Sequence, residues 1–110
     1  MPQFPATTPA LEVWLPTAVE RLQQALQPQA IWLFGSHARG TATRRSDLDL
    51  LLVWETSLPI LERIGQVLEL LADAPCAVEP LCYTPDELER IRDRPFIRSI
   101  LADRQVLHER

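Results

Sequence analysis

The sequence predicts an α+β fold in which a small mixed β-sheet is flanked by helices. Short apolar runs with strand character alternate with longer segments whose apolar residues recur at helical spacing. Their order is helix, strand, strand, helix, strand, helix, helix, strand, without internal repeats, which favours one sheet covered by helices. The chain has 110 residues, of which 46% are apolar and 24% charged, so it is long enough for one compact domain and too short for two.

The first ten residues differ in composition from the rest of the chain. They contain three of the ten prolines, two threonines and no charged residue, so we expect a flexible N-terminal arm over residues 1–10. A single domain is then expected over residues 11–110. From Leu11 to Leu26 apolar residues recur at helical spacing, which predicts an amphipathic helix with Pro16 tolerated in its first turn.

Two apolar runs in the middle of the chain have strand character. The run from Ala30 to Phe34 is apolar throughout and ends at Gly35, which suits a buried strand. The run from Leu48 to Trp54 is also apolar except for Asp49. At its start, from Asp47 to Leu50, acidic and apolar residues alternate, and this period of two is typical of a strand with one face in a core. Both runs are therefore expected in the sheet.

A long helix is predicted over residues 59–73. Its packed face is expected to hold Leu61, Ile64, Leu68 and Leu71, widened by Ile60 and Val67. Its exposed face is expected to hold Glu62, Arg63, Gln66 and Glu69.

The second half of the chain ends in further short elements. A strand is expected from Ala77 to Tyr83, where Pro80 lacks a backbone donor and so favours a sheet edge or a bulge. A capped helix from Thr84 to about Arg92, a short helix after it and a last strand from Gln105 to His108 complete the chain.

Charge and composition exclude several classes of function. Fifteen acidic and eleven basic residues give a net charge of -4, which argues against a protein that binds nucleic acid through its phosphates. The absence of lysine excludes a phosphate-loop lysine, Schiff-base chemistry and a lysine adenylate. No apolar run approaches the roughly 20 residues that span a bilayer, so we expect a cytoplasmic protein without membrane contact.

The cysteines and histidines give no sign of a disulfide or a structural zinc site. An extended chain would hold Cys76 and Cys82 beyond disulfide reach, so both are expected to be reduced. They lack the paired spacing of zinc ligands, and His37 and His108 are far apart in sequence.

The hexapeptide GSHARG follows the first predicted strand and holds two of the three glycines. Gly35 and Ser36 are expected to open a short helical turn that ends at Arg39, with Gly40 as a left-handed cap. The free N–H groups of such a turn and the Ser36 hydroxyl could receive the phosphates of a nucleotide. The alternative is an ordinary strand-to-helix turn, and His37 within it is expected to take no part in the chemistry.

Three acidic residues are candidate metal ligands. Asp47 and Asp49 are two apart on a strand, which puts their carboxylates on one face about 6.5 to 7 Å apart. Such a pair at the edge of a core suits bridging Mg²⁺, although a solvated strand end remains an alternative. Glu79 in the next strand is the candidate third ligand and proton acceptor; otherwise it is an exposed strand residue.

The segment GSHARGTATRRSDLDLLLV resembles the signature of the DNA polymerase beta-like nucleotidyltransferases: Gly-Ser, ten residues, then Asp-x-Asp. The lead-in AIWLFGSHARG and the later AVEPLCYTPDEL are similar to the minimal nucleotidyltransferase (MNT) proteins, which are usually encoded beside a HEPN-domain partner. The resemblance covers about residues 17–108. It implies the polymerase beta-like fold, ATP and Mg²⁺, metal binding by Asp47 and Asp49, and triphosphate binding by Gly35 and Ser36.

The resemblance also implies an activity and a partner. MNT proteins act as antitoxins that transfer AMP from ATP to a tyrosine hydroxyl of a HEPN ribonuclease toxin, so a complex with such a toxin is expected. Arg39, Arg44 and Arg45 could steady the departing phosphates, although each could also be a solvated loop residue.

The chain departs from the family pattern at two positions in the strand that carries the third acid. The third acid is usually aspartate but is Glu79 here, and Pro80 is expected to disturb the strand that aims it. Two alternatives therefore stay open. One is an antitoxin that neutralises its partner by contact alone. The other is a small-molecule nucleotidyltransferase, although such enzymes usually carry a further acceptor domain.

Overall fold

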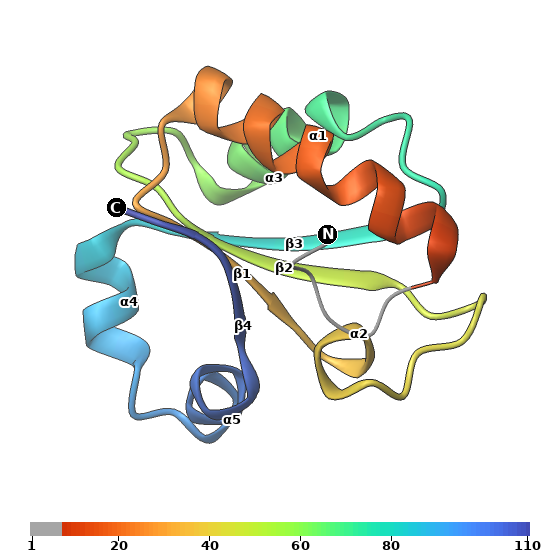
Figure 1. The fold of residues 1–110 in the computed structure, drawn as a ribbon. Helices are drawn as coiled ribbons and strands as arrows, with labels where there is room; N and C mark the ends of the chain where they lie inside the picture. Colours follow the sequence, from red (N-terminus) through yellow and green to blue (C-terminus); the bar gives the residue numbers. More distant parts are fainter. Residues whose placement is uncertain (1–7) are drawn as a thin grey trace.

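A computed structural model describes residues 8–110 of the chain (Figure 1). Four strands form one sheet in the order β3-β2-β1-β4. Strand β1 pairs antiparallel with both β2 and β4, whereas β2 and β3 are parallel, so the sheet is mixed. The strands are β1 (Ala30–Phe34), β2 (Leu48–Val53), β3 (Val78–Tyr83) and β4 (Gln105–Glu109). The predicted fold class is confirmed.

Helices cover both faces of the sheet (Figure 1). One core lies between the sheet and the first and third helices, and the other lies between the sheet and the last two. The central strands β1 and β2 are apolar on both faces because both faces are covered. The helices are α1 (Pro9–Leu26), α2 (Ser36–Arg39), α3 (Ile60–Leu70), α4 (Pro85–Ile91) and α5 (Pro95–Asp103).

The first helix begins earlier than the sequence predicts. Thr8 caps α1 by accepting a 3.4 Å hydrogen bond from the Leu11 amide, and Pro9 takes the first helical position. Residues 8–10 therefore belong to the helix and its cap, while residues 1–7 of the predicted arm lie outside the described residues. Pro16, expected in the first turn, is inside the helix on its exposed side, and buried residues such as Ala18 on the opposite side pack the helix onto the core.

The third strand keeps its register through Pro80. β3 is an edge strand, as Pro80 predicts, and it pairs with β2 without a bulge from Leu48 opposite Val78 to Val53 opposite Tyr83. The expected disturbance by Pro80 is therefore wrong, because an edge strand needs ladder hydrogen bonds on one side only. Cys76 and Cys82 are both free, as expected.

The predicted packed face of α3 is confirmed only in part: Ile64 and Leu71 pack in the core, but the other leucines and Arg63 do not lie as predicted. Leu61 is 82% exposed and Leu68 41% exposed, whereas Arg63, expected in solvent, is 5% exposed. Leu71, expected in the helix, caps it and donates its amide to the Val67 carbonyl. A buried arginine is tolerated here because the fold supplies acceptors for its guanidinium.

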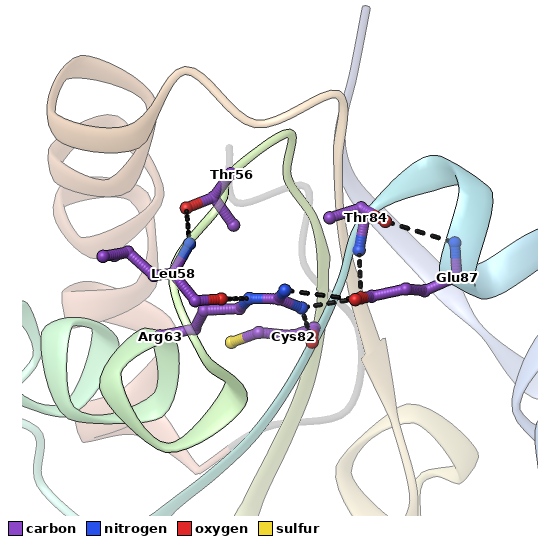
Figure 2. Close-up of polar contacts among 6 residues, drawn as sticks. All are labelled: Thr56, Leu58, Arg63, Cys82, Thr84 and Glu87. Carbon is purple, nitrogen blue, oxygen red and sulfur yellow. Dashed lines mark hydrogen bonds and ion pairs between the residues drawn. The ribbon is translucent and has the colours of Figure 1, made fainter.

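Figure 2 shows how Arg63 connects α3, β3 and α4. Its guanidinium donates to the Leu58 carbonyl at 2.7 Å and to the Cys82 carbonyl at 3.3 Å. It also forms a two-pronged ion pair with the Glu87 carboxylate at 2.6 and 3.1 Å. Glu87 accepts from the Thr84 amide and the Thr84 hydroxyl accepts from the Glu87 amide, so the predicted cap of α4 is confirmed as a full capping box.

Within residues 8–110, no helix combines the length and the apolar character that a bilayer span requires.

Candidate functional site

The β2–β3 pairing brings two of the predicted acidic residues side by side. Asp49 on β2 lies opposite Glu79 on β3 and opposite Phe34 on β1. Residues in register on neighbouring strands point to the same face, so the two carboxylates share the face that α4 and α5 partly cover. Asp47, two residues earlier, has the same orientation, because the intervening Leu48 is fully buried in the opposite core.

These three acids, the acidic cluster of Asp47, Asp49 and Glu79, influence one another electrostatically. The pKa of Glu79 is raised, first by the negative charge of Asp47 and then by its hydrogen bond to Asp47 and the charge of Asp49. The pKa of Asp49 is raised mainly because it is partly buried, with a further contribution from Asp47. Mutual repulsion of this kind disfavours the fully ionised cluster, and a bound cation would relieve it.

The acidic cluster is open. Among residues 8–110, no three Asp, Glu, His or Cys side chains converge closely enough to enclose a metal ion. The donor set nevertheless fits Mg²⁺, which takes one or two carboxylates from the protein and completes its shell with water and substrate phosphate. Asp49 and Glu79 lie together, and Asp47 extends the cluster at the exposed end of β2.

The glycine turn has the geometry predicted from the sequence. Gly35 has φ 75° and ψ -154°, a backbone conformation that glycine alone adopts readily, and Gly40 closes α2 in the left-handed region at φ 78° and ψ 18°. A Cβ atom on Gly35 would collide with the Asp49 carboxylate. The turn therefore lies directly against the acidic cluster, and its first N–H groups have no partner within the helix.

A cavity of about 290 Å³ opens beside the acids, and we call it the site cavity. One wall comes from the glycine turn and the sheet, and the other from α5. The lining residues are Phe34, Gly35, Arg39, Asp49 and Glu79 on the first wall, and Phe96, Ser99, Ile100 and Asp103 on the second. Arg39 is half exposed and 4.0 Å from Asp103, which leaves its guanidinium available to an incoming anion.

The α5 wall of the site cavity is not predicted by the sequence. Phe96 is the residue that could have drawn attention, because it directly follows Pro95 and interrupts a polar stretch. The local sequence pattern does not predict that α5 covers this face of the sheet. That placement depends on the packing of Ile97 and Ile100 against the sheet residues of the second core.

The other predicted residues lie outside the site cavity. Arg44 and Arg45 are exposed in the loop after α2, and Arg44 lines a different cavity of about 300 Å³ together with His37 and Cys76. His37 is 1% exposed, and its Nε2 lies 3.4 Å from the Ser46 carbonyl oxygen. It therefore packs beneath the loop that leads to Asp47, a structural role that the sequence did not reveal.

Comparison with known proteins agrees with this geometry. Residues 15–108 match the family described as nucleotidyltransferase domain. A protein of Methanocaldococcus jannaschii named "Putative protein adenylyltransferase MJ1305" is 34% identical over 88 residues. The match covers 74% of this chain and 58% of that protein, so the chain spans little more than half the length of this relative.

Solved structures share the fold at low sequence identity. One is described as the toxin-antitoxin MntA-HpeT mutant; it has a TM-score of 0.63 and 18% identity, covering 86% of this chain and 72% of the matched chain. Another, described as a toxin-antitoxin with AMP-PNP, has a TM-score of 0.58 and 19% identity, covering 87% and 73%.

Proposed function

Because the chain belongs to the nucleotidyltransferase domain family, we propose that it transfers AMP from ATP to a tyrosine hydroxyl of a HEPN ribonuclease toxin and so acts as an antitoxin. The names of the relatives support this proposal: one is named "Putative protein adenylyltransferase MJ1305", and two solved structures are described as toxin-antitoxin structures, one of them with AMP-PNP. The observation that carries it is the register of Asp49 with Glu79, directly against the Gly35 turn.

Each part of the site has an assigned role in this proposal. Gly35 and Ser36 bind the triphosphate through the turn, and Arg39 supports the phosphates from the wall of the site cavity. The acidic cluster would hold Mg²⁺. When bound, the ion neutralises phosphate charge and polarises the reacting oxygens.

The reaction is an in-line displacement at the α-phosphorus of ATP. The tyrosine oxygen forms a bond to the α-phosphorus while the bond from that phosphorus to the α,β-bridging oxygen breaks, and pyrophosphate leaves. Glu79 accepts the hydroxyl proton. It lies in register with Asp49, which borders the Gly35 turn.

One observation favours a second function, neutralisation of the toxin by contact alone. The acidic cluster is open among the residues that the structure describes, and its third acid is a glutamate on an edge strand. A displacement of about 1 Å from productive geometry can lower a rate about a hundredfold.

Co-expression with the HEPN partner separates the two functions. Intact-mass spectrometry of the partner is expected to show one or more AMP-sized additions with the wild-type chain and none with the Asp47→Ala/Asp49→Ala variant. A matched control, Glu55→Ala/Asp93→Ala, removes two exposed acids that lie outside the site cavity and should leave the modification intact. An unmodified but neutralised partner would contradict the transferase proposal and support the contact function.

A further inference from the structure

An exposed aromatic ring stands on the wall of the site cavity. Phe96, the second residue of α5, follows Pro95 at the helix start and is 60% exposed. Its ring centroid lies 6.3 Å from that of Phe34 at an interplanar angle of 81°. Phe34 is buried at the end of β1, directly before Gly35, so it provides a fixed support for the exposed ring.

The edge-to-face geometry leaves a face of Phe96 free for a ligand. With the rings nearly perpendicular, Phe34 covers at most one face of Phe96. The high exposure of Phe96 means that the other face meets solvent. An apolar ring left in water next to two carboxylates gains free energy when a flat, aromatic ligand covers it.

We infer that Phe96 is the stacking surface for the nucleobase of the bound nucleotide, a nucleotide-binding role that rests on the proposed function. The site cavity joins the phosphate-binding turn at Gly35 and the acids Asp49 and Glu79 to the ring of Phe96. A nucleotide whose phosphates lie at the turn can therefore reach this ring with its base. Every base has a π face, so stacking on Phe96 binds bases of different identity similarly.

Phe96 variants test this inference in binding measurements with Mg²⁺ and without an acceptor protein. The probes are the α,β-methylene analogues of ATP and GTP, which cannot transfer a nucleotidyl group, and inorganic tripolyphosphate, which has no base. Isothermal titration calorimetry of the full chain gives Kd for each. Phe96→Ala is expected to weaken the binding of both nucleotide analogues roughly 5- to 150-fold and to leave that of tripolyphosphate within about twofold.

Two further variants separate stacking from folding and from general loss of apolar surface. Phe96→Tyr keeps the flat ring and should bind both analogues like the wild type. Leu61→Ala removes an 82% exposed apolar side chain on α3, outside the site cavity, and should change nothing.

The outcomes distinguish this inference from the proposed function. If Phe96→Ala binds the analogues as tightly as the wild type, or loses tripolyphosphate to the same extent, base stacking is wrong while nucleotide binding stands. If, in the transfer assay with the partner, Phe96→Ala raises only the KM for the acceptor protein and leaves analogue binding unchanged, the ring receives the acceptor instead and the inference is overturned. If the wild-type chain binds neither analogue, the proposed function fails and the inference fails with it.

Discussion

Replacing Arg63 by methionine should destabilise the fold by about 3 kcal/mol. Arg63 is 5% exposed, and its guanidinium satisfies the Leu58 and Cys82 carbonyls and the Glu87 carboxylate. Removing one partner of a buried ion pair costs roughly 3–5 kcal/mol, because the other charge stays behind without compensation. The Glu87 side chain is 32% exposed, so water can solvate part of its unpaired charge. The cost is therefore expected at the lower end of the range of roughly 3–5 kcal/mol. For a domain of 110 residues this corresponds to a fall in Tm of roughly 12 °C.

A double-mutant cycle tests the origin of this cost. Urea unfolding is measured for the wild type, Arg63→Met, Glu87→Gln and the double variant. Glutamine can keep the capping-box bond at this position, so Glu87→Gln mainly removes the charge. The double variant should be more stable than the sum of the two single costs predicts, because no charge is left unpaired. If the losses of unfolding free energy in the two single variants add to that of the double variant within about 0.5 kcal/mol, the ion pair is not the cause of the destabilisation.

The same pair predicts the response of stability to acid. The pKa of Glu87 is lowered to about 2, first by its hydrogen bond with Arg63 and then by the Thr84 amide. An acid whose pKa is lower in the folded state stabilises the fold above its unfolded pKa and loses this contribution as the pH falls through the folded value. Between about pH 5 and pH 2, the free energy of unfolding should therefore fall more steeply for the wild type than for Glu87→Gln.

Two further predictions concern the site. Gly35→Ala should destabilise the chain by about 1–3 kcal/mol in thermal unfolding and abolish ATP binding, because the added Cβ would displace the Asp49 carboxylate. The control Gly65→Ala has nothing within 4 Å of the added Cβ and should instead stabilise α3 by about 0.5–1 kcal/mol. Glu79→Gln should raise the Tm at neutral pH without Mg²⁺, because the pKa of Glu79 is raised in the folded state and its ionised side chain therefore destabilises the fold. A lower Tm would contradict repulsion among the three acids. The same variant should abolish AMP transfer, because it removes the proposed proton acceptor.

The parts that sequence predicts best are those set by local pattern. The alternation from Asp47 to Leu50 places two carboxylates on one face, and the two glycines around Ser36 fix the turn. Their register with Glu79 follows once β3 lies beside β2. The α5 wall could not be predicted in this way, because Phe96 reaches the site cavity only through the packing of α5 on the sheet.

The error in α3 has a different origin. The predicted stripe combines Leu61 and Leu68, which are exposed, with Val67 and Leu71, which are buried. Periodicity alone does not say where the buried part of such a wide stripe ends. The deciding contact is the guanidinium of Arg63, whose acceptors come from residues up to 24 positions later in the chain. A buried ion pair between distant residues leaves no periodic signal in the sequence.

This ion pair also bears on the acidic cluster. β3 is an edge strand that pairs with β2 alone, so Glu79 is held by a ladder on one side. Arg63 adds a second restraint, because it donates to the carbonyl of Cys82, three residues after Glu79 on the same strand. Its partner Glu87 caps α4, which begins directly where β3 ends. The position of the third acid thus depends on a buried contact at the other end of its strand, and this explains how Glu79 can stay in register next to a proline.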